Sequence, residues 1–307
     1  MSDEEQFMAE VTALFEVGDY AKIIETWGKD TSNSDKFKAA AFEGFTPRPN
    51  DVLVSTYPKS GTTWALHMAY EIGYLGDGDY AHSYDVFSWP DNLVPLENNP
   101  PLSDLSYLAD SPTGLRVIKT HLEAPFVPVA DGKHISVIRD PKDIIVSMMH
   151  FENGFNEILF GGSIPVQAFV DSFQTDKFIY QSWPMFIDSW WSLRDRDNVL
   201  VLTYESMKAD LVGTIGKMAR FLEIELNEAQ LAKVAEKSSY GWMKANDHKY
   251  AQPAFGEAEQ VPLVRSGKAG SAKELLSAEQ QAAIDNFCIQ RLDQLGSEFP
   301  YQEMYLR

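Results

Sequence analysis

Short apolar runs separated by polar loops recur through the middle of the chain and predict a sheet of parallel strands. Four runs rich in Val, Ile and Leu have the length of buried strands: residues 51–56, 115–119, 134–138 and 199–203. Apolar residues at helical spacing follow the first, third and fourth runs. Strands that alternate with helices indicate an α/β fold, and we expect a single domain with a central parallel sheet flanked by helices.

Residues 1–45 predict helices only. The apolar residues that mark their faces are Phe7, Val11, Leu14 and Phe15, then Tyr20, Ile23, Ile24 and Trp27. We interpret this segment as an N-terminal helical extension that packs against a main domain of residues 46–307. A chain of 307 residues suits one large domain better than two. Near the C-terminus, residues 277–280 have the form of a capping box and predict a helix that ends at Gly296.

The stretch of residues 51–66, DVLVSTYPKSGTTWAL, combines a strand, a tight polar loop and the start of a helix. The free N–H groups at the start of a helix and the helix dipole favour an anion, and Lys59 adds a mobile charge. The lysine precedes Gly61, so the loop does not have the Walker A order. A phosphate-binding loop is the favoured interpretation. The alternative is a plain turn in which Thr62 or Thr63 caps the helix.

Polar residues follow the predicted strands where those strands end. Lys59, His121, Arg139 and Tyr204 each follow one of the four runs within three residues. The carboxyl ends of parallel strands lie at one edge of a sheet, where ligands bind in such folds. We therefore expect these four side chains to meet at one edge.

The composition of the chain excludes several classes of binding partner and site. The formal net charge of −19 argues against nucleic acid and anionic membranes, although a polyanionic nucleotide can bind where basic residues gather locally. We find no apolar run long enough for a membrane span, and the acidic first 20 residues do not have the pattern of a signal peptide, so we expect a cytoplasmic protein. Cys288 is the only cysteine, which excludes an intrachain disulfide and a cysteine metal cluster.

The loop sequence YPKSGTTW resembles the 5′-phosphosulfate loop of the cytosolic sulfotransferases, which transfer a sulfonate group from 3′-phosphoadenosine 5′-phosphosulfate (PAPS) to an acceptor. The segment IKTHL of residues 118–122 resembles the part of those enzymes that carries the catalytic histidine. The segment of residues 137–151, VIRDPKDIIVSMMHF, resembles their 3′-phosphate motif. The resemblance covers roughly residues 45–275 and implies a P-loop-like site, PAPS as donor, adenosine 3′,5′-bisphosphate (PAP) as product and no metal.

The resemblance assigns roles to individual residues. It implies His121 as the general base, Lys59 at the oxygen that bridges sulfur and phosphorus, and Lys119 at the transferring sulfonate, with Ser147 among both the catalytic and the nucleotide-binding residues. The expected nucleotide-binding residues are Lys59, Ser60, Gly61, Thr62, Thr63, Trp64, Arg139, Ser147, Tyr204, Ser239, Tyr240, Arg265, Ser266 and Gly267. The expected acceptor-binding residues are Phe87, Trp89, Phe151 and Phe155.

The chain departs from the family pattern at several positions. Glu123 stands where many members have proline, and Ser266 replaces a lysine that would add a cationic contact. Ser271 and Ala272 stand where the family usually has Asp-Trp, which leaves the cover over the nucleotide less defined. Residues 273–282 keep only the lysine of a C-terminal motif through which many relatives dimerise, so we expect a monomer or a different dimer.

Structural roles compete with each functional assignment. His121 could be a structural residue at a strand end, Arg139 could pair with Asp140 or Asp143, and the aromatic residues of the loop after residue 76 could simply pack it down. The favoured function is transfer of a sulfonate group to a hydroxyl or amine of a small, aromatic or apolar acceptor. The alternatives are a P-loop nucleotide phosphotransferase, and a PAP- or PAPS-binding protein or dehydratase on the same scaffold.

Overall fold

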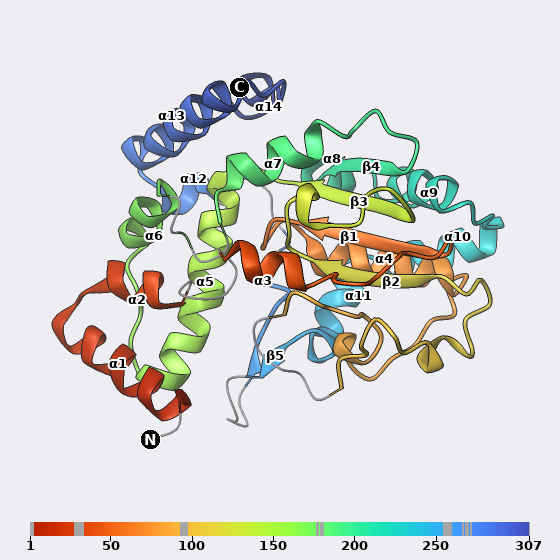
Figure 1. Ribbon diagram of the computed structural model, residues 1–307, viewed down its shortest axis with the longest axis horizontal. Helices are drawn as coiled ribbons and strands as arrows, with labels where there is room; N and C mark the ends of the chain where they lie inside the picture. The colour runs from red at the N-terminus through yellow and green to blue at the C-terminus, as the bar shows by residue number, and fades with distance from the viewer. Residues whose placement is uncertain are drawn as a thin grey trace.

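The computed structural model describes residues 3–27, 34–92, 98–175, 178, 181–253, 260–265, 267, 270 and 272–306. The four predicted strands are confirmed as β1 (Asp51–Thr56), β2 (Arg116–Thr120), β3 (Lys133–Ile138) and β4 (Val199–Thr203). They form one parallel sheet in the order β2-β1-β3-β4 (Figure 1). Strands β5 (Gln252–Pro253) and β6 (Gln260–Val261) form a separate antiparallel pair.

Helices make up most of the remaining described chain. The α-helices are α1 (Asp3–Val17), α2 (Tyr20–Trp27), α3 (Asp35–Ala40), α4 (Thr62–Gly73), α5 (Pro141–Phe160), α6 (Val166–Phe173), α7 (Trp183–Trp191), α8 (Tyr204–Ala209), α9 (Leu211–Leu222), α10 (Glu228–Lys237), α11 (Tyr240–Ala245), α12 (Ala272–Leu275), α13 (Ala278–Leu295) and α14 (Tyr301–Tyr305). Short 3-10 turns are η1 (Ser83–Asp85), η2 (Ser106–Leu108), η3 (Ala124–Phe126) and η4 (Asp247–Lys249). The predicted capping box is confirmed, because the Ser277 and Gln280 side chains cap α13 reciprocally.

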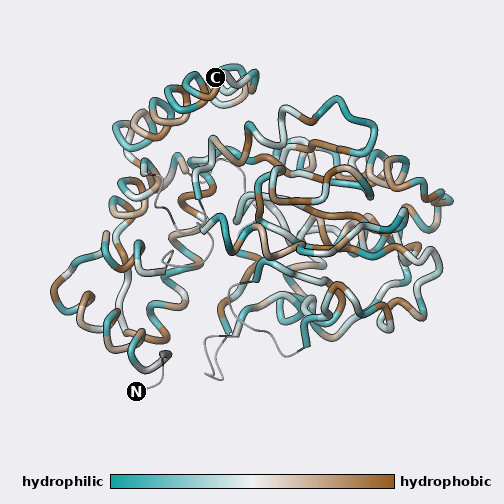
Figure 2. The backbone as a smooth tube through the Cα atoms, in the orientation of Figure 1, coloured by the Kyte–Doolittle hydropathy of each residue, from teal (hydrophilic) through white to brown (hydrophobic). Residues whose placement is uncertain are grey.

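Alternating side chains of the strands fill two cores, one on each face of the sheet. Leu53 of β1 packs into a core with α5, α7 and α13. Its neighbours Val52 and Val54 pack into the opposite core with α4 and α9. Figure 2 shows apolar residues along the strands and a mixture of polar and apolar residues on the outer helices. Because both faces are covered, the central strands read as nearly continuous apolar runs.

The order of the strands places a topological switch point at the carboxyl ends of the paired strands β1 and β3. From β1 the chain passes through α4 to β2 on one side, and from β3 it passes through α5 to β4 on the other. The loops that follow β1 and β3 therefore diverge at the carboxyl edge of the sheet, which is where ligands bind in open α/β folds. Lys59 follows β1 and Arg139 follows β3.

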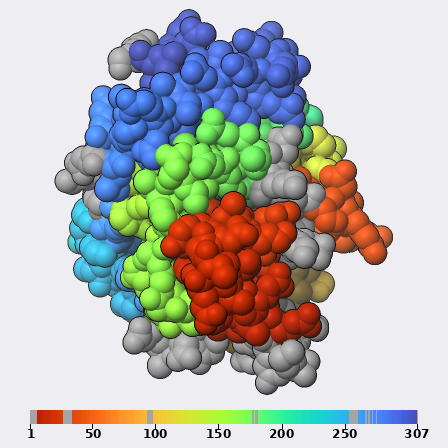
Figure 3. Space-filling model, turned by 90° about the vertical axis from the view of Figure 1, so that its left-hand side faces the viewer, coloured from red at the N-terminus to blue at the C-terminus, as the bar shows by residue number. Residues whose placement is uncertain are grey.

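The first helices of the chain lie in two places. Phe15 of α1 stacks on Phe160 at the end of α5, with ring centroids 5.5 Å apart. In Figure 3 the red surface of α1 and α2 covers part of the green surface of α5 and α6. Helix α3 lies apart from them, in front of the sheet in Figure 1. Within the described part of the chain, no helix combines the length and apolar character that crossing a membrane requires.

Candidate functional site

The loop after β1 adopts left-handed backbone conformations at two positions, of which only the one at Lys59 is strained. Lys59 has a φ of 65° and Gly61 a φ of 97°, and both values lie in the left-handed region. A Cβ atom on Gly61 would lie 2.8 Å from the Tyr204 ring, so this position excludes side chains on two grounds. The loop turns tightly into α4, and the first residues of that helix, Thr62 and Thr63, line the cavity, so the free N–H groups of the helix start lie at its wall.

Contacts from distant residues hold this loop in place. The Tyr57 hydroxyl donates a hydrogen bond to the Gln181 carbonyl at 2.9 Å. The Thr56 and Thr62 hydroxyls lie 2.5 Å apart across the turn. Thr62 and Thr63 both line the cavity, whereas the buried Ser60 hydroxyl does not. In the described part of the chain, the Ser60 oxygen has no hydrogen-bond partner.

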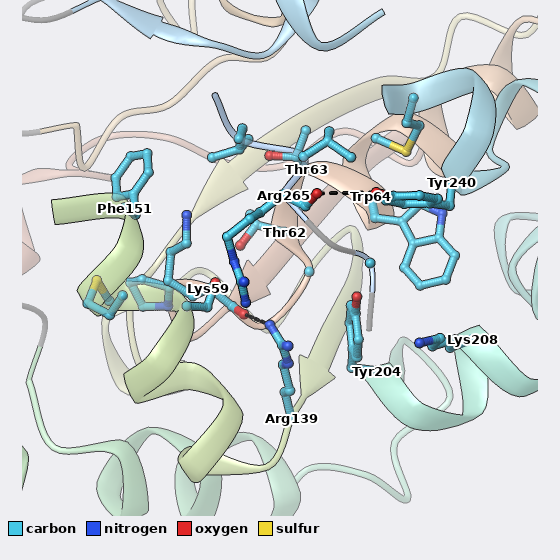
Figure 4. Close-up of a pocket in the computed structure, with 18 of the residues that line it drawn as sticks. Lys59, Thr62, Thr63, Trp64, Arg139, Phe151, Tyr204, Lys208, Tyr240 and Arg265 are labelled. Atoms are coloured by element: carbon cyan, nitrogen blue, oxygen red, sulfur yellow. Dashed lines mark hydrogen bonds between the residues drawn. The ribbon is translucent and has the colours of Figure 1, made fainter. Parts of the chain in front are cut away.

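Arg139 joins the loop of β1 to the helix after β3. Its Nη1 donates to the Lys59 carbonyl at 2.8 Å, and its Nη2 lies 3.7 Å from Asp143 Oδ2 (Figure 4). The guanidinium carbon lies 4.3 Å from the centroid of the Tyr204 ring. The salt bridge to Asp143 that competed with a functional role is therefore present, yet Arg139 also lines the cavity together with Ser147 of α5. Its Nε is buried and has no partner among the described residues.

Asp143 connects Arg139 to the chain beyond Gly267. One carboxylate oxygen accepts the Gly270 N–H at 2.7 Å, and the other accepts the Ala272 N–H at 2.9 Å. The Asp143 side chain is 2% exposed, so these bonds form out of water. The same carboxylate thus fixes the segment that enters α12 and balances the charge of Arg139.

Two lysines reach the cavity, each over an aromatic ring. Lys59 Nζ lies 3.6 Å from the Phe151 ring centroid, and Lys119 Nζ lies 3.1 Å from the Trp89 ring centroid. Burial lowers the pKa of both ammonium groups to about 7. For Lys59, the charges of Arg139 and Arg265 lower the pKa further, and Glu152 opposes them.

His121 has a fixed ring orientation. Its Nδ1 lies 2.8 Å from the Thr56 carbonyl oxygen, which can only accept, so Nδ1 carries the proton in this contact. The neutral ring then presents Nε2 as its acceptor nitrogen. Burial, followed by the charges of Lys119 and Lys59, lowers the pKa of His121 to about 3. The backbone N–H of His121 donates to Asp91 at 2.8 Å, which fixes the main chain as well.

The opposite end of the cavity is built by aromatic residues. Trp64 Nε1 donates to the Ser238 carbonyl at 2.8 Å, and its indole lies edge-on to the Tyr204 ring at 5.6 Å between centroids. The Ser239 hydroxyl caps α11, and Tyr240 is half-exposed at the cavity wall. The Tyr240 hydroxyl donates to the Arg265 carbonyl at 3.2 Å, while the Arg265 side chain points toward Arg139 (Figure 4).

These groups surround one cavity of about 450 Å³ at the carboxyl edge of the sheet. The sequence-predicted residues that line it are Lys59, Gly61, Thr62, Thr63, Trp64, Trp89, Lys119, His121, Arg139, Ser147, Phe151, Tyr204, Ser239, Tyr240, Arg265 and Gly267. The lining therefore concentrates cations, although the whole chain carries a formal charge of −19. Such a site attracts a small polyanion and repels a large one.

A few predicted residues lie elsewhere. Phe87 is 2% exposed and borders a small separate cavity beside Trp89. Phe155 lies behind Phe151, with ring centroids 5.0 Å apart, and does not line the main cavity. Ser266 lies outside the described residues. The acceptor-binding roles of Phe87 and Phe155 stay predictions.

The cavity also contains residues that the sequence did not single out. They are Pro58, Met148, Lys208, Leu211, Met243, Gln252, Leu263 and Val264. A signal existed for Lys208, because it follows Tyr204 by four residues and shares its face of a helix. Leu263 and Val264 come from a segment held by Asp247, whose Oδ1 accepts both of their N–H groups. No periodic pattern marks that contact in the sequence.

Comparisons with known proteins agree with the geometry. A family model described as a sulfotransferase domain matches residues 49–296. Luciferin sulfotransferase of Photinus pyralis is 30% identical over 85% of this chain and 77% of its own length. Sulfotransferase 1B1 of Canis lupus familiaris is 31% identical over 86% of this chain and 88% of its own.

Solved structures show the same fold. Mouse sulfotransferase SULT7A1, complexed with PAP, has a TM-score of 0.65 and 25% identity over 85% of this chain and 91% of its own. Retinol dehydratase, in a complex with retinol and PAP, has a TM-score of 0.66 and 22% identity over 86% of this chain and 87% of its own. Given these matches and the phosphate loop after β1, the chain belongs to the cytosolic-type sulfotransferase family and is a sulfotransferase.

Proposed function

We propose that the chain transfers the sulfonate group of PAPS to a hydroxyl or amine of a small aromatic or apolar acceptor, with His121 as the general base. The proposal rests on the orientation of the His121 ring. Its Nδ1 is committed to the Thr56 carbonyl, so Nε2 is the nitrogen that can accept a proton. The lowered pKa keeps that nitrogen unprotonated at neutral pH in the empty site.

The cavity fits the donor at both of its ends. The N–H groups after Gly61 and the Lys59 ammonium suit the 5′-phosphosulfate, and a Cβ on Gly61 would close the approach. For the 3′-phosphate, Arg139 offers a guanidinium whose buried Nε has no partner among the described residues, and Ser147 offers a hydroxyl from the same cavity wall. Trp64 and Tyr240 offer aromatic surface for adenine. PAP in the solved mouse sulfotransferase supports this donor.

The reaction needs one proton transfer and one displacement at sulfur. The acceptor oxygen or nitrogen forms a bond to sulfur while its proton passes to His121 Nε2. The bond from sulfur to the bridging oxygen breaks, and its electron pair stays on the 5′-phosphate of PAP. Lys59 stabilises the negative charge that grows on that oxygen, and Lys119 stabilises the sulfonate during transfer.

The acceptor would enter beside Trp89 and Phe151, the two aromatic residues that carry the lysine ammonium groups on their faces. Both rings line the cavity, and the Trp89 ring lies edge-on to His121 with ring centroids 5.5 Å apart. The described lining contains no Asp or Glu side chain, which favours neutral acceptors over cationic ones. We therefore expect phenols and apolar alcohols to react more readily than protonated amines.

Turnover with sulfur-labelled PAPS against a panel of phenols, alcohols and amines tests the proposal. We expect label in the acceptor and one PAP for each sulfonate transferred. Tight PAP binding without transfer to any acceptor would instead identify a binding protein. Transfer of phosphate from a nucleoside triphosphate would identify a phosphotransferase, and either result would overturn the proposed function.

A further inference from the structure

A buried ion pair connects the N-terminal helices to the segment that carries His121. Lys38 of α3 lies 2.9 Å from Glu123 Oε1, and the two side chains are only 7% and 6% exposed. Lys38 Nζ also lies 5.1 Å from the Phe126 ring centroid, at the end of η3. The two residues are 85 positions apart in the sequence, and Glu123 follows His121 by two.

Other contacts hold the segment of residues 121–124 from the opposite direction. The His121 carbonyl accepts a hydrogen bond from Gln181 at 2.8 Å, and the Leu122 carbonyl accepts one from Trp190 at 3.1 Å. The Ala124 N–H donates to the Ser189 hydroxyl at 3.2 Å. All three partners belong to α7 or to the chain just before it. Glu123 thus connects this segment to the N-terminal helices through its side-chain contact with Lys38.

The pair depends on both members. Glu123 Oε2 has no hydrogen-bond partner in the part of the chain that the structure describes, so Lys38 supplies the countercharge to a carboxylate that is out of water. A buried carboxylate that loses its countercharge takes up a proton, moves toward solvent or draws water in. Movement of the Glu123 side chain toward solvent would displace the main chain two residues from the His121 ring.

We propose that α3 completes the active site, with Lys38 acting through Glu123 as a positioning residue for His121. The inference rests on the proposed role of His121 as the base. The N-terminal segment then contributes to turnover as well as to packing. A shift of about 1 Å in a catalytic group is enough to slow a positioned reaction by about a hundredfold.

The backbone of Glu123 permits a sharp control. Its φ of −63° and ψ of 153° match the values that proline adopts, and no hydrogen bond of its N–H to a described residue is present. Proline at this position removes the carboxylate and restrains the chain locally. Leucine removes the carboxylate without that restraint. Two double variants, Lys38→Met with Glu123→Pro and Lys38→Met with Glu123→Leu, therefore have equal charge and differ in backbone freedom.

The experiment measures kcat, the acceptor KM and the Kd for PAP in the full chain, with activity expressed per PAP-binding site. We expect Lys38→Met to lower kcat at least tenfold while PAP affinity stays within about twofold. Lys36→Met is the matched control, because Lys36 lies on the same helix and is exposed, and it should match the wild type. The double variant with proline should recover kcat to within about threefold, and the one with leucine should not.

Several outcomes would overturn the inference. A Lys38→Met protein with wild-type kcat contradicts it directly. If that variant does not fold, the two double variants test the inference instead, since neither leaves a buried charge unpaired. A wild-type kcat in both of them would refute positioning through Glu123. His121→Ala is assayed in parallel. Retained turnover in His121→Ala refutes the role of His121 as the base. If His121→Ala loses turnover but the Lys38 variants have a normal kcat, only the role of α3 is refuted.

Discussion

The affinity for PAP should fall as pH rises, because the empty site holds Lys59 with a pKa of about 7. Burial is the main cause of that pKa, and the nearby charges of Arg139 and Arg265 add to it. The 5′-phosphate of the nucleotide adds opposite charge beside Lys59, where the charges of Glu152 and Asp247 do not offset the effect of burial. Binding should therefore restore the pKa of Lys59 toward its ordinary value and take up a proton.

The size of the effect follows from the free-state pKa. At pH 8, one unit above 7, roughly nine in ten empty sites carry a neutral Lys59 and must be protonated before or during binding. Affinity at pH 8 should therefore be about tenfold weaker than at pH 6, which corresponds to about 1.4 kcal/mol. Lys119 also has a pKa of about 7. If nucleotide binding protonates Lys119 as well, the difference in PAP affinity between pH 6 and pH 8 becomes larger.

Stability of the nucleotide-free protein should change with pH in the opposite direction. The folded pKa of Lys59 is lowered relative to the unfolded chain, so between pH 7 and about 10 the unfolded state binds more protons. Stability rises with pH wherever the unfolded state binds more protons. The contribution of Lys59 to the free energy of unfolding therefore increases over the range in which PAP affinity declines.

Isothermal titration with PAP at pH 6, 7 and 8, in buffers of different ionisation enthalpy, measures both affinity and proton uptake. Lys59→Arg is the control, because arginine stays protonated and should bind PAP with little change between pH 6 and 8. A wild-type Kd that is constant over this range, with no proton uptake at pH 8, would refute the argument that burial holds the pKa of Lys59 near neutrality.

Three further predictions concern the nucleotide and assembly. Arg139→Ala should lose most of the preference for PAP over adenosine 5′-monophosphate, about ten- to a hundredfold in affinity for a charge-assisted contact, and calorimetry that finds the preference intact would exclude Arg139 as the 3′-phosphate ligand. Asp143→Asn should weaken PAP binding and speed PAP release in stopped flow, because one of the N–H groups of Gly270 and Ala272 loses its charged acceptor; unchanged release would contradict this. Light scattering should show no dimer built on residues 273–282, and cross-links within that segment between two copies would disprove it.

Much of the fold could be predicted because local patterns and tertiary structure agree. The four apolar runs are strands whose bounds lie within about one residue of the prediction. Parallel strands that are buried on both faces consist almost entirely of apolar residues, so such runs are easy to recognise. Lys59, His121 and Arg139 meet at one edge because each follows a parallel strand. That inference needs only strand direction and no knowledge of the packing.

Contacts between residues far apart in the chain could not be predicted from the sequence. Met243 and Leu263 enter the cavity through packing that no periodicity records. Phe87 belongs to an aromatic-rich loop, yet its ring packs on Tyr70 and Tyr80, and an aromatic residue in such a loop gives no sign of which surface it faces. The Lys38 pair with Glu123 was hidden for the same reason, because its two members are 85 residues apart.

Transfer of sulfonate from PAPS in this cavity, with His121 as the base, can be measured in one reaction cycle. A single-turnover assay with labelled PAPS and a reactive phenol, comparing the wild type with His121→Ala at saturating donor, tests it most directly. We expect transfer to slow by roughly 10²- to 10⁴-fold in His121→Ala while the Kd for PAP is unchanged, since the base acts on the acceptor. Near-normal transfer by His121→Ala would show that His121 is not the base.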